Sequence, residues 1–67
     1  MQGIVVFLPD KKGIHSVYLM KLKARGEIDW NDDGFALAHT TTRDCAINYA
    51  TKLASRLGLS VLEIRET

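Results

Sequence analysis

The sequence predicts an α+β domain: a small antiparallel-dominated sheet of four or five strands with one helix, in the C-terminal half of the chain, packed on one face. Two observations lead to this class. Residues 41–65 carry the signals of a capped amphipathic helix followed by a strand, and residues 4–39 carry short strand-like runs separated by turns. The expected order is three or four strands, then the helix, then a last strand.

The first two strands are predicted from different patterns. Residues 4–8 are all apolar, favour strands and end at a turn over 9–13, so an interior strand is expected there. Residues 16–24 alternate between an apolar side and a largely basic side. This period of two predicts a half-exposed strand, with a helix as the alternative.

The remaining strands are shorter. Ile28 and Trp30 share one side of a short run, and a turn at 31–34 leads into a strand over 35–39. The last strand is expected over 60–65, where apolar and charged side chains alternate.

The helix is expected over about 42–57. Thr41 is the predicted N-cap, and the carboxylate of Asp44 suits the positive end of the helix dipole. Apolar residues at three- and four-residue spacing define the face that should pack on the sheet: Ala46, Tyr49, Ala50, Leu53, Ala54 and Leu57. Gly58 is the predicted left-handed stop, and Leu59 is expected to fold back on the last turn as in a Schellman motif.

Length and composition limit the class of protein. With 67 residues the chain is expected to form one domain over 1–67, with a small core that dimerisation would support. A hydrophobic share of 46% with 25% charged residues is typical of globular proteins. No apolar run approaches the roughly 20 residues of a membrane helix, so no membrane association and a cytoplasmic location are expected. The single Cys45 cannot form an internal disulfide, which agrees with a reducing compartment.

The segment 29–34 is the nearest match to a ligand-binding motif. Oxygen-bearing residues at its first, third and fifth positions are followed by glycine, as at the start of an EF-hand calcium loop. The twelfth position, where such a loop has a bidentate Glu, is Thr40, and no helical pattern precedes Asp29. The alternative is a hairpin turn, which favours Asn, Asp and Gly for their backbone conformations. We therefore expect a turn, with no bound metal or cofactor.

The other candidate metal-binding and catalytic sets each lack residues that their chemistry requires. His39, Asp44 and Cys45 are close in sequence, but zinc needs three or four ligands and only the distant His15 could be added. Cys45 lies near a helix N-terminus, where a thiol can become nucleophilic, but its position beside the apolar face predicts a partly buried small side chain. His15 and Ser16 are neighbours on a strand and point to opposite faces, which excludes a relay between them. No catalytic motif occurs, so an enzyme is not expected.

Charge is distributed unevenly, although the net charge is only +1. Residues 11–25 contain bases and no acid: Lys11, Lys12, Lys21, Lys23 and Arg25. Residues 27–33 contain acids and no base: Glu27, Asp29, Asp32 and Asp33. The basic block could neutralise phosphates, which makes nucleic-acid binding one hypothesis. The alternative is that both blocks are solvated faces that keep a small sheet soluble.

Trp30 is the only tryptophan and flanks the acidic turn. A core side chain beside Phe35 is expected, with an exposed anchor for a basic protein surface as the alternative. The overall prediction is a non-enzymatic protein-binding module, of adaptor or inhibitor type, that uses Glu27, Asp29, Trp30, Asp32 and Asp33. The alternative is a small nucleic-acid-binding protein that uses the basic block. Complementary blocks could also pair two copies as a homodimer.

Overall fold

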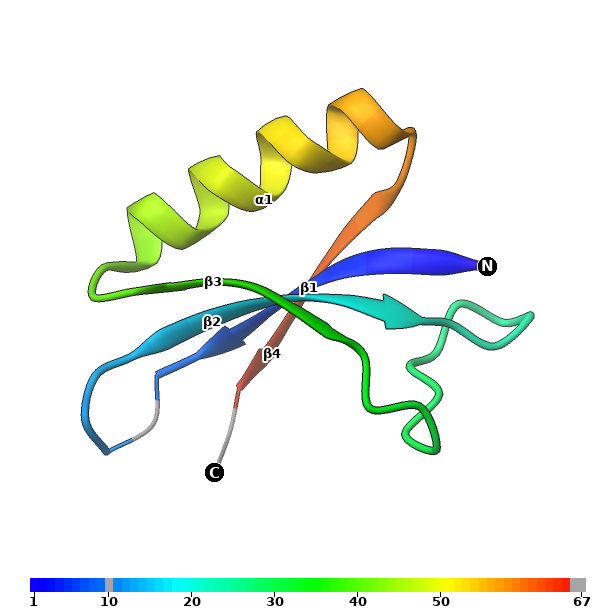
Figure 1. Cartoon of the computed structure of the whole chain (residues 1–67), viewed down its shortest axis with the longest axis horizontal. Coiled ribbons are helices and arrows are strands. Elements are labelled where there is room, and N and C mark those ends of the chain that lie inside the picture. Colours follow the sequence, from blue (N-terminus) through cyan, green and yellow to red (C-terminus); the bar gives the residue numbers. More distant parts are fainter. Residues whose placement is uncertain (10, 66–67) are drawn as a thin grey trace.

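A computed structural model of the chain describes residues 1–9 and 11–65. Its elements, in chain order, are β1 (Gln2–Leu8), β2 (His15–Lys21), β3 (Phe35–Thr40), α1 (Arg43–Leu57) and β4 (Ser60–Arg65). The predicted α+β class is confirmed, with one sheet and one helix in the second half of the chain (Figure 1). Residues 15–21 form a strand and not the alternative helix.

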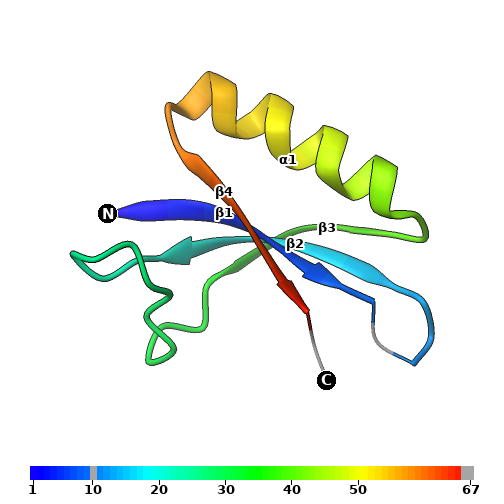
Figure 2. The same ribbon diagram turned by 180° about the vertical axis from the view of Figure 1, so that it is seen from behind.

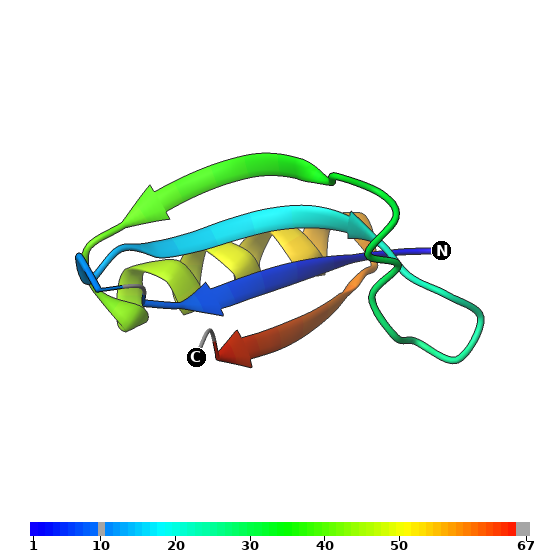
Figure 3. The ribbon, with the colours of Figure 1, turned by 90° about the horizontal axis from the view of Figure 1, so that it is seen from below.

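The sheet has four strands in the order β3-β2-β1-β4 (Figure 3). β1 pairs antiparallel with β2 and parallel with β4, so the prediction of an interior first strand is confirmed. β2 and β3 pair antiparallel, with a bulge between Val17 and Tyr18. The run at Ile28 and Trp30 adds no fifth strand, because it makes only a single bridge, between Ile28 and Leu22.

The helix α1 crosses one face of the sheet and connects its two edge strands, β3 and β4 (Figure 2). Three alanines spaced four residues apart face the sheet and are buried: Ala46, Ala50 and Ala54. They pack with Ile4, Val6 and Val17, which are fully buried. The small alanine side chains let the helix lie close to the strands.

The predicted apolar face of the helix was too wide. Tyr49 and Leu57 are exposed, whereas Ile47, which the prediction left out, packs against the core. The three alanines face the sheet, and Tyr49 lies about 100° round the helix from the middle of this row. Leu57 is in line with the row, but it is the last residue of the helix and is exposed there. Cys45 was expected to be partly buried, but it is exposed.

The helix ends follow local sequence signals, with one correction at the start. Thr42, not Thr41, is the N-cap: its hydroxyl accepts a hydrogen bond of 3.2 Å from the backbone N–H of Cys45. At the other end Gly58 has φ 69°, and the N–H of Leu59 donates to the carbonyl of Ala54 at 2.9 Å. The predicted left-handed stop and Schellman bond are therefore confirmed.

The opposite face of the sheet has a second apolar cluster of Val5, Met20, Leu22 and Ile28. Leu22 and Ile28 belong to the segment 22–34, which lies on the side of the sheet away from α1 (Figure 1). Leu22 covers Gly3 of β1, where a Cβ would lie 2.8 Å from Leu22 Cδ1. Within the described residues no helix has the length and apolar character that crossing a bilayer requires.

Candidate protein-binding surface

Three aromatic side chains lie on the face of the sheet opposite α1, and we call them the aromatic shelf: Phe7, Tyr18 and Trp30. Strand register places Phe7 of β1 beside Ser16 of β2 and Ile64 of β4, and puts Tyr18 one row further along the same face. Phe7 and Tyr18 are only partly buried, although both pack on the second apolar cluster. The segment 22–34, which carries Trp30, covers one end of this face and leaves Phe7 and Tyr18 partly exposed.

The rings of the shelf contact one another through edges and tilted faces. The centroids of Phe7 and Tyr18 are 5.5 Å apart with their planes at 89°, which is an edge-to-face contact. Those of Phe7 and Trp30 are 6.2 Å apart at 52°. Trp30 is therefore supported on one side by Phe7 and is open on the other.

The prediction that Trp30 fills the core beside Phe35 is wrong. Trp30 is 64% exposed and Phe35 is 66% exposed. The buried cluster beside the segment 22–34 is formed by Met20, Leu22 and Ile28 with Val5 instead. The alternative that the sequence left open, an exposed tryptophan beside the acidic turn, is what the structure contains.

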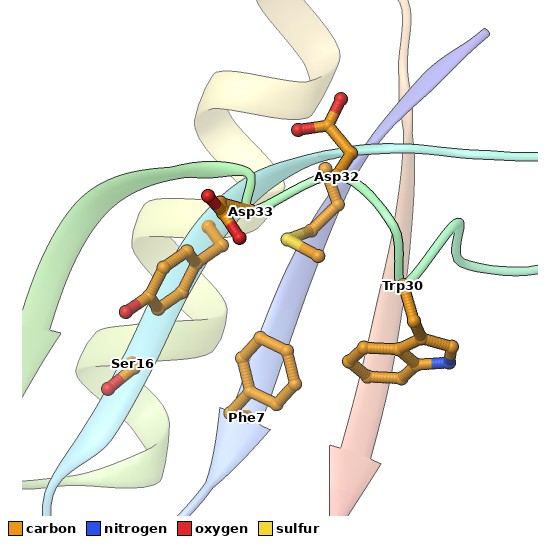
Figure 4. Close-up of a pocket in the computed structure, with 7 residues that line it drawn as sticks. Phe7, Ser16, Trp30, Asp32 and Asp33 are labelled. Atoms are coloured by element: carbon orange, nitrogen blue, oxygen red, sulfur yellow. The ribbon is translucent and has the colours of Figure 1, made fainter.

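A hollow of about 330 Å³ lies in front of the shelf, between the sheet and the acidic turn (Figure 4). It is lined by Phe7, Ser16, Tyr18, Met20, Trp30, Asp32 and Asp33. In Figure 4 the ring of Phe7 and the indole of Trp30 lie side by side, with both carboxylates above them. The lining thus combines aromatic rings with two acids and contains no Lys, Arg or His.

The acidic turn that carries these carboxylates is built by local hydrogen bonds. Asp29 Oδ1 accepts from the N–H of Asn31 at 3.1 Å, and Asp32 Oδ1 accepts from the N–H of Gly34 at 2.9 Å. Gly34 has φ 71°, and a Cβ on it would collide with the sulfur of Met20. A turn is therefore present, and two of its acids hold its backbone. The prediction of a hairpin turn is wrong, because no strand leads into it: β2 ends at Lys21 and β3 begins at Phe35.

The predicted protein-binding residues do not all reach the same hollow. Trp30, Asp32 and Asp33 line it together with the aromatic shelf. Asp29 lines a neighbouring hollow with Lys21, and Glu27 lines one on the other side of Trp30. Trp30 is thus the wall shared by an acidic hollow and a mainly apolar one that also includes Leu62 and Ile64.

The predicted basic residues form two separate groups. Lys11 and Lys12 lie in the turn between β1 and β2, whereas Lys21, Lys23 and Arg25 lie at and beyond the far end of β2. Six residue steps along this strand separate the groups by about 20 Å. Lys21 lines a hollow with Asp29, Asp32 and Asp33, so the basic and acidic blocks of the sequence adjoin each other in space.

The structure brings together no group of three metal-ligating side chains among residues 1–9 and 11–65. Neither the acids of the turn nor the set His39, Asp44 and Cys45 forms such a group within these residues. The carboxylates of Asp29 and Asp32 accept hydrogen bonds from their own loop.

Sequence analysis missed a hydrogen bond between Ser16 and His39. The register of β2 and β3 pairs these residues, and Ser16 Oγ lies 3.0 Å from His39 Nδ1. His39 also contacts Tyr18 edge-on, with ring centroids 6.3 Å apart. His15, in contrast, is buried on the other face, as the alternation predicted. Among the described residues no carboxylate bonds to His39, so the pair lacks the third member of a triad.

The signal that could have found this pair is the strand register. The alternation of β2 indicates that Ser16 and Tyr18 share a face, but the bulge between Val17 and Tyr18 shifts the partner residues on β3. A sequence gives no local sign of that shift.

Comparisons with models of protein families, with curated proteins and with solved structures give no match to this chain, so the assignment of function depends on the surface itself.

Proposed function

We propose that this chain is a small non-enzymatic protein-binding module, of adaptor or inhibitor type, that binds a partner with a basic surface. The binding surface is the open face of the sheet with the acidic turn around Trp30. The observation that carries the proposal is a tryptophan that is 64% exposed, contacts Phe7 and borders a hollow with two carboxylates.

An exposed tryptophan in this setting favours binding over a structural role. Tryptophan is enriched among interface residues that contribute most to affinity, because it buries a large rigid area at small entropic cost. Here Phe7 and Tyr18 extend the apolar area behind it, and Leu62 and Ile64 continue that area on its other side. A partner that covers this face would complete the burial that α1 supplies on the opposite face.

Charge selects the chemistry of the partner. Asp32 and Asp33 line the hollow, and Asp29 lines the neighbouring one together with them. A basic surface would be attracted to this rim, whereas an acidic surface or a phosphate backbone would be repelled. Nucleic-acid binding is less well supported, because the basic residues are divided between the two ends of β2 and three of the acids lie beside Lys21.

The test is affinity capture with the folded chain as bait, followed by identification and purification of the captured protein. We expect one saturable partner whose binding is lost with Trp30→Ala and weakened at least tenfold with Asp33→Lys. Asp33 is chosen because Asp32 holds the turn through its bond to Gly34. Phe35→Ala is the matched control, since Phe35 is equally exposed but lies outside the hollow.

The result that would contradict the proposal is binding that all three variants retain. Retention of DNA or RNA that is lost with Lys21→Glu and Lys23→Glu, and is unaffected by Trp30→Ala, would favour the nucleic-acid alternative.

A further inference from the structure

We infer that the hollow of the aromatic shelf receives a single cationic side chain, lysine or arginine, from the partner. This inference rests on the proposed function and specifies the group that the partner inserts. The observation that supports it is that one hollow is lined by the aromatic residues Phe7, Tyr18 and Trp30 together with the acidic residues Asp32 and Asp33.

The ring arrangement leaves aromatic faces available to a cation. A cation is attracted to the face of an aromatic ring within about 6 Å of its centroid, and most strongly to tryptophan. Phe7 and Trp30 meet at 52° and therefore do not stack on each other, so they form the two sides of a wedge. Tyr18 lines the same hollow, with its ring plane at 89° to that of Phe7.

The size of the hollow suits one side chain. Its volume of about 330 Å³ is at the lower end of the range for pockets that hold small ligands, which begins at about 300 Å³. A helix or a strand of the partner would not fit inside it. The backbone of the partner would therefore remain outside, over the open face of the sheet, with one long side chain pointing inward.

The carboxylates exclude the other classes of side chain. An acidic group would meet Asp32 and Asp33 with no base in the lining to balance them. A purely apolar group would remove water from both carboxylates without replacing their hydrogen bonds. A nucleic-acid base could stack on the rings, but its phosphates would lie against the acids. A long alkyl chain that ends in a cation satisfies both the rings and the acids.

Most of the walls are held in place before a ligand binds. Phe7 and Tyr18 belong to paired strands of the sheet, and the bond from Gly34 N–H to Asp32 fixes the turn. Trp30 projects from the segment 22–34 and is the most exposed part of the lining that has a measured ring contact. Binding should therefore be reported by Trp30 itself.

The test is a titration of the folded chain with five short peptides, each Gly-Gly-X-Gly-Gly with blocked ends. X is lysine, arginine, trimethyl-lysine, acetyl-lysine or glutamate. Fluorescence of Trp30, the only tryptophan, gives the dissociation constant, and amide NMR shifts of Phe7, Tyr18 and Asp33 locate the site. We expect saturable binding of the three cationic peptides and none of the glutamate peptide.

Acetylation provides the decisive control because it keeps the length of lysine and removes its charge. We expect acetyl-lysine to bind at least about fivefold more weakly than lysine, as the loss of cation–π and carboxylate attraction implies. Asp33→Asn should weaken the lysine peptide severalfold, and Phe35→Ala should leave it unchanged. Equal binding of lysine and acetyl-lysine, or shifts located elsewhere on the chain, would overturn the inference.

The peptide experiment can fail separately from the proposed function. A captured protein that depends on Trp30 while no cationic peptide binds the hollow would leave the module intact and overturn the cation inference. Cationic peptides that bind the hollow while capture gives no Trp30-dependent partner would contradict the module and leave the side-chain preference standing. A trimethyl-lysine peptide that binds as well as lysine would show that ring faces contribute most of the attraction.

Discussion

The two faces of the sheet carry similar apolar side chains, but they are covered in different ways. On the α1 side, Ile4, Val6 and Val17 are fully buried beneath a helix that spans the sheet. On the other side Val5 is equally buried, whereas Phe7 remains partly open because the segment 22–34 reaches only one end. The open face therefore has buried apolar residues next to the sheet, as a core has, but its outer aromatic residues remain partly exposed.

Charge separates the two faces further. The α1 side carries one ion pair, between Arg43 and Glu63 at 2.7 Å, and both of its members are well exposed. A pair of this kind contributes at most about 1 kcal/mol. On the open side, Asp32 and Asp33 line a hollow together with aromatic rings, and Lys21 lines the adjoining hollow with the same two acids. The α1 side is thus closed by a helix, whereas the open side leaves aromatic side chains partly uncovered beside an acidic rim.

The largest effect should come from breaking the α1 side. Ile4→Ala removes a fully buried side chain, and we expect a loss of about 2–5 kcal/mol in the free energy of unfolding. A domain of this size has only about 5 kcal/mol in total, so the variant should be partly unfolded at room temperature. Urea denaturation followed by circular dichroism measures the loss. Trp30→Ala on the open side should cost less than about 1 kcal/mol, and an equal loss in both variants would contradict the contrast between the faces.

An effect of intermediate size on stability should come from a substitution in the segment 22–34, which covers one end of the open side. Gly34→Ala places a methyl group against Met20 at a backbone φ of 71°, so both strain and collision oppose it. We expect a loss of about 2–3 kcal/mol, since left-handed strain alone costs about 1–2 kcal/mol. The measurement is the midpoint of thermal unfolding.

Gly13→Ala is the matched control for Gly34→Ala. Gly13 has φ 76°, but nothing lies within 4 Å of a Cβ built there, so strain is its only cost. The difference between the two variants therefore measures the contacts of the added methyl group with Met20 and with the carbonyl oxygen of Leu19, which would lie 3.1 Å away. Equal losses would mean that the segment 22–34 moves away from Met20 without cost, and the hollow would then not be held in place.

The smallest effect on stability should come from removing the N-cap of α1. Thr42→Ala removes the hydroxyl that accepts from the N–H of Cys45, and we expect a loss of about 1 kcal/mol. Thr41→Ala, one residue earlier, should change stability by less than about 0.5 kcal/mol. Chemical denaturation of both variants measures the difference. A larger loss for Thr41→Ala would place the N-cap where the sequence alone put it.

Sequence patterns predicted the fold more fully than the surface. Five apolar residues in a row gave the interior strand, and Gly58 gave the helix end. The acidic turn was predicted because Asp, Asn and Gly have strong local preferences. The N-cap was placed one residue early because Thr41 and Thr42 are equally good caps by residue type, and only the backbone decides between them.

The surface was harder to predict because its residues come from distant parts of the chain. Phe7, Tyr18 and Trp30 belong to two strands and a loop, and Trp30 was expected to be buried. Its exposure depends on whether Leu22 and Ile28 already fill the space beneath it. The packing of these side chains depends on the tertiary structure, so the composition of the segment does not predict it.

By itself, the sequence determined the class of this protein, its single helix and the positions of its turns, because these depend on periodicity and on the local preferences of single residues. The tertiary structure alone decided which residues meet. Strand register paired Ser16 with His39 and made Phe7 and Tyr18 diagonal neighbours, and the packing of the segment 22–34 left Trp30 exposed beside Asp32 and Asp33. The physical reason is that register and filled volume are properties of pairs of distant segments, and no local stretch of sequence encodes them.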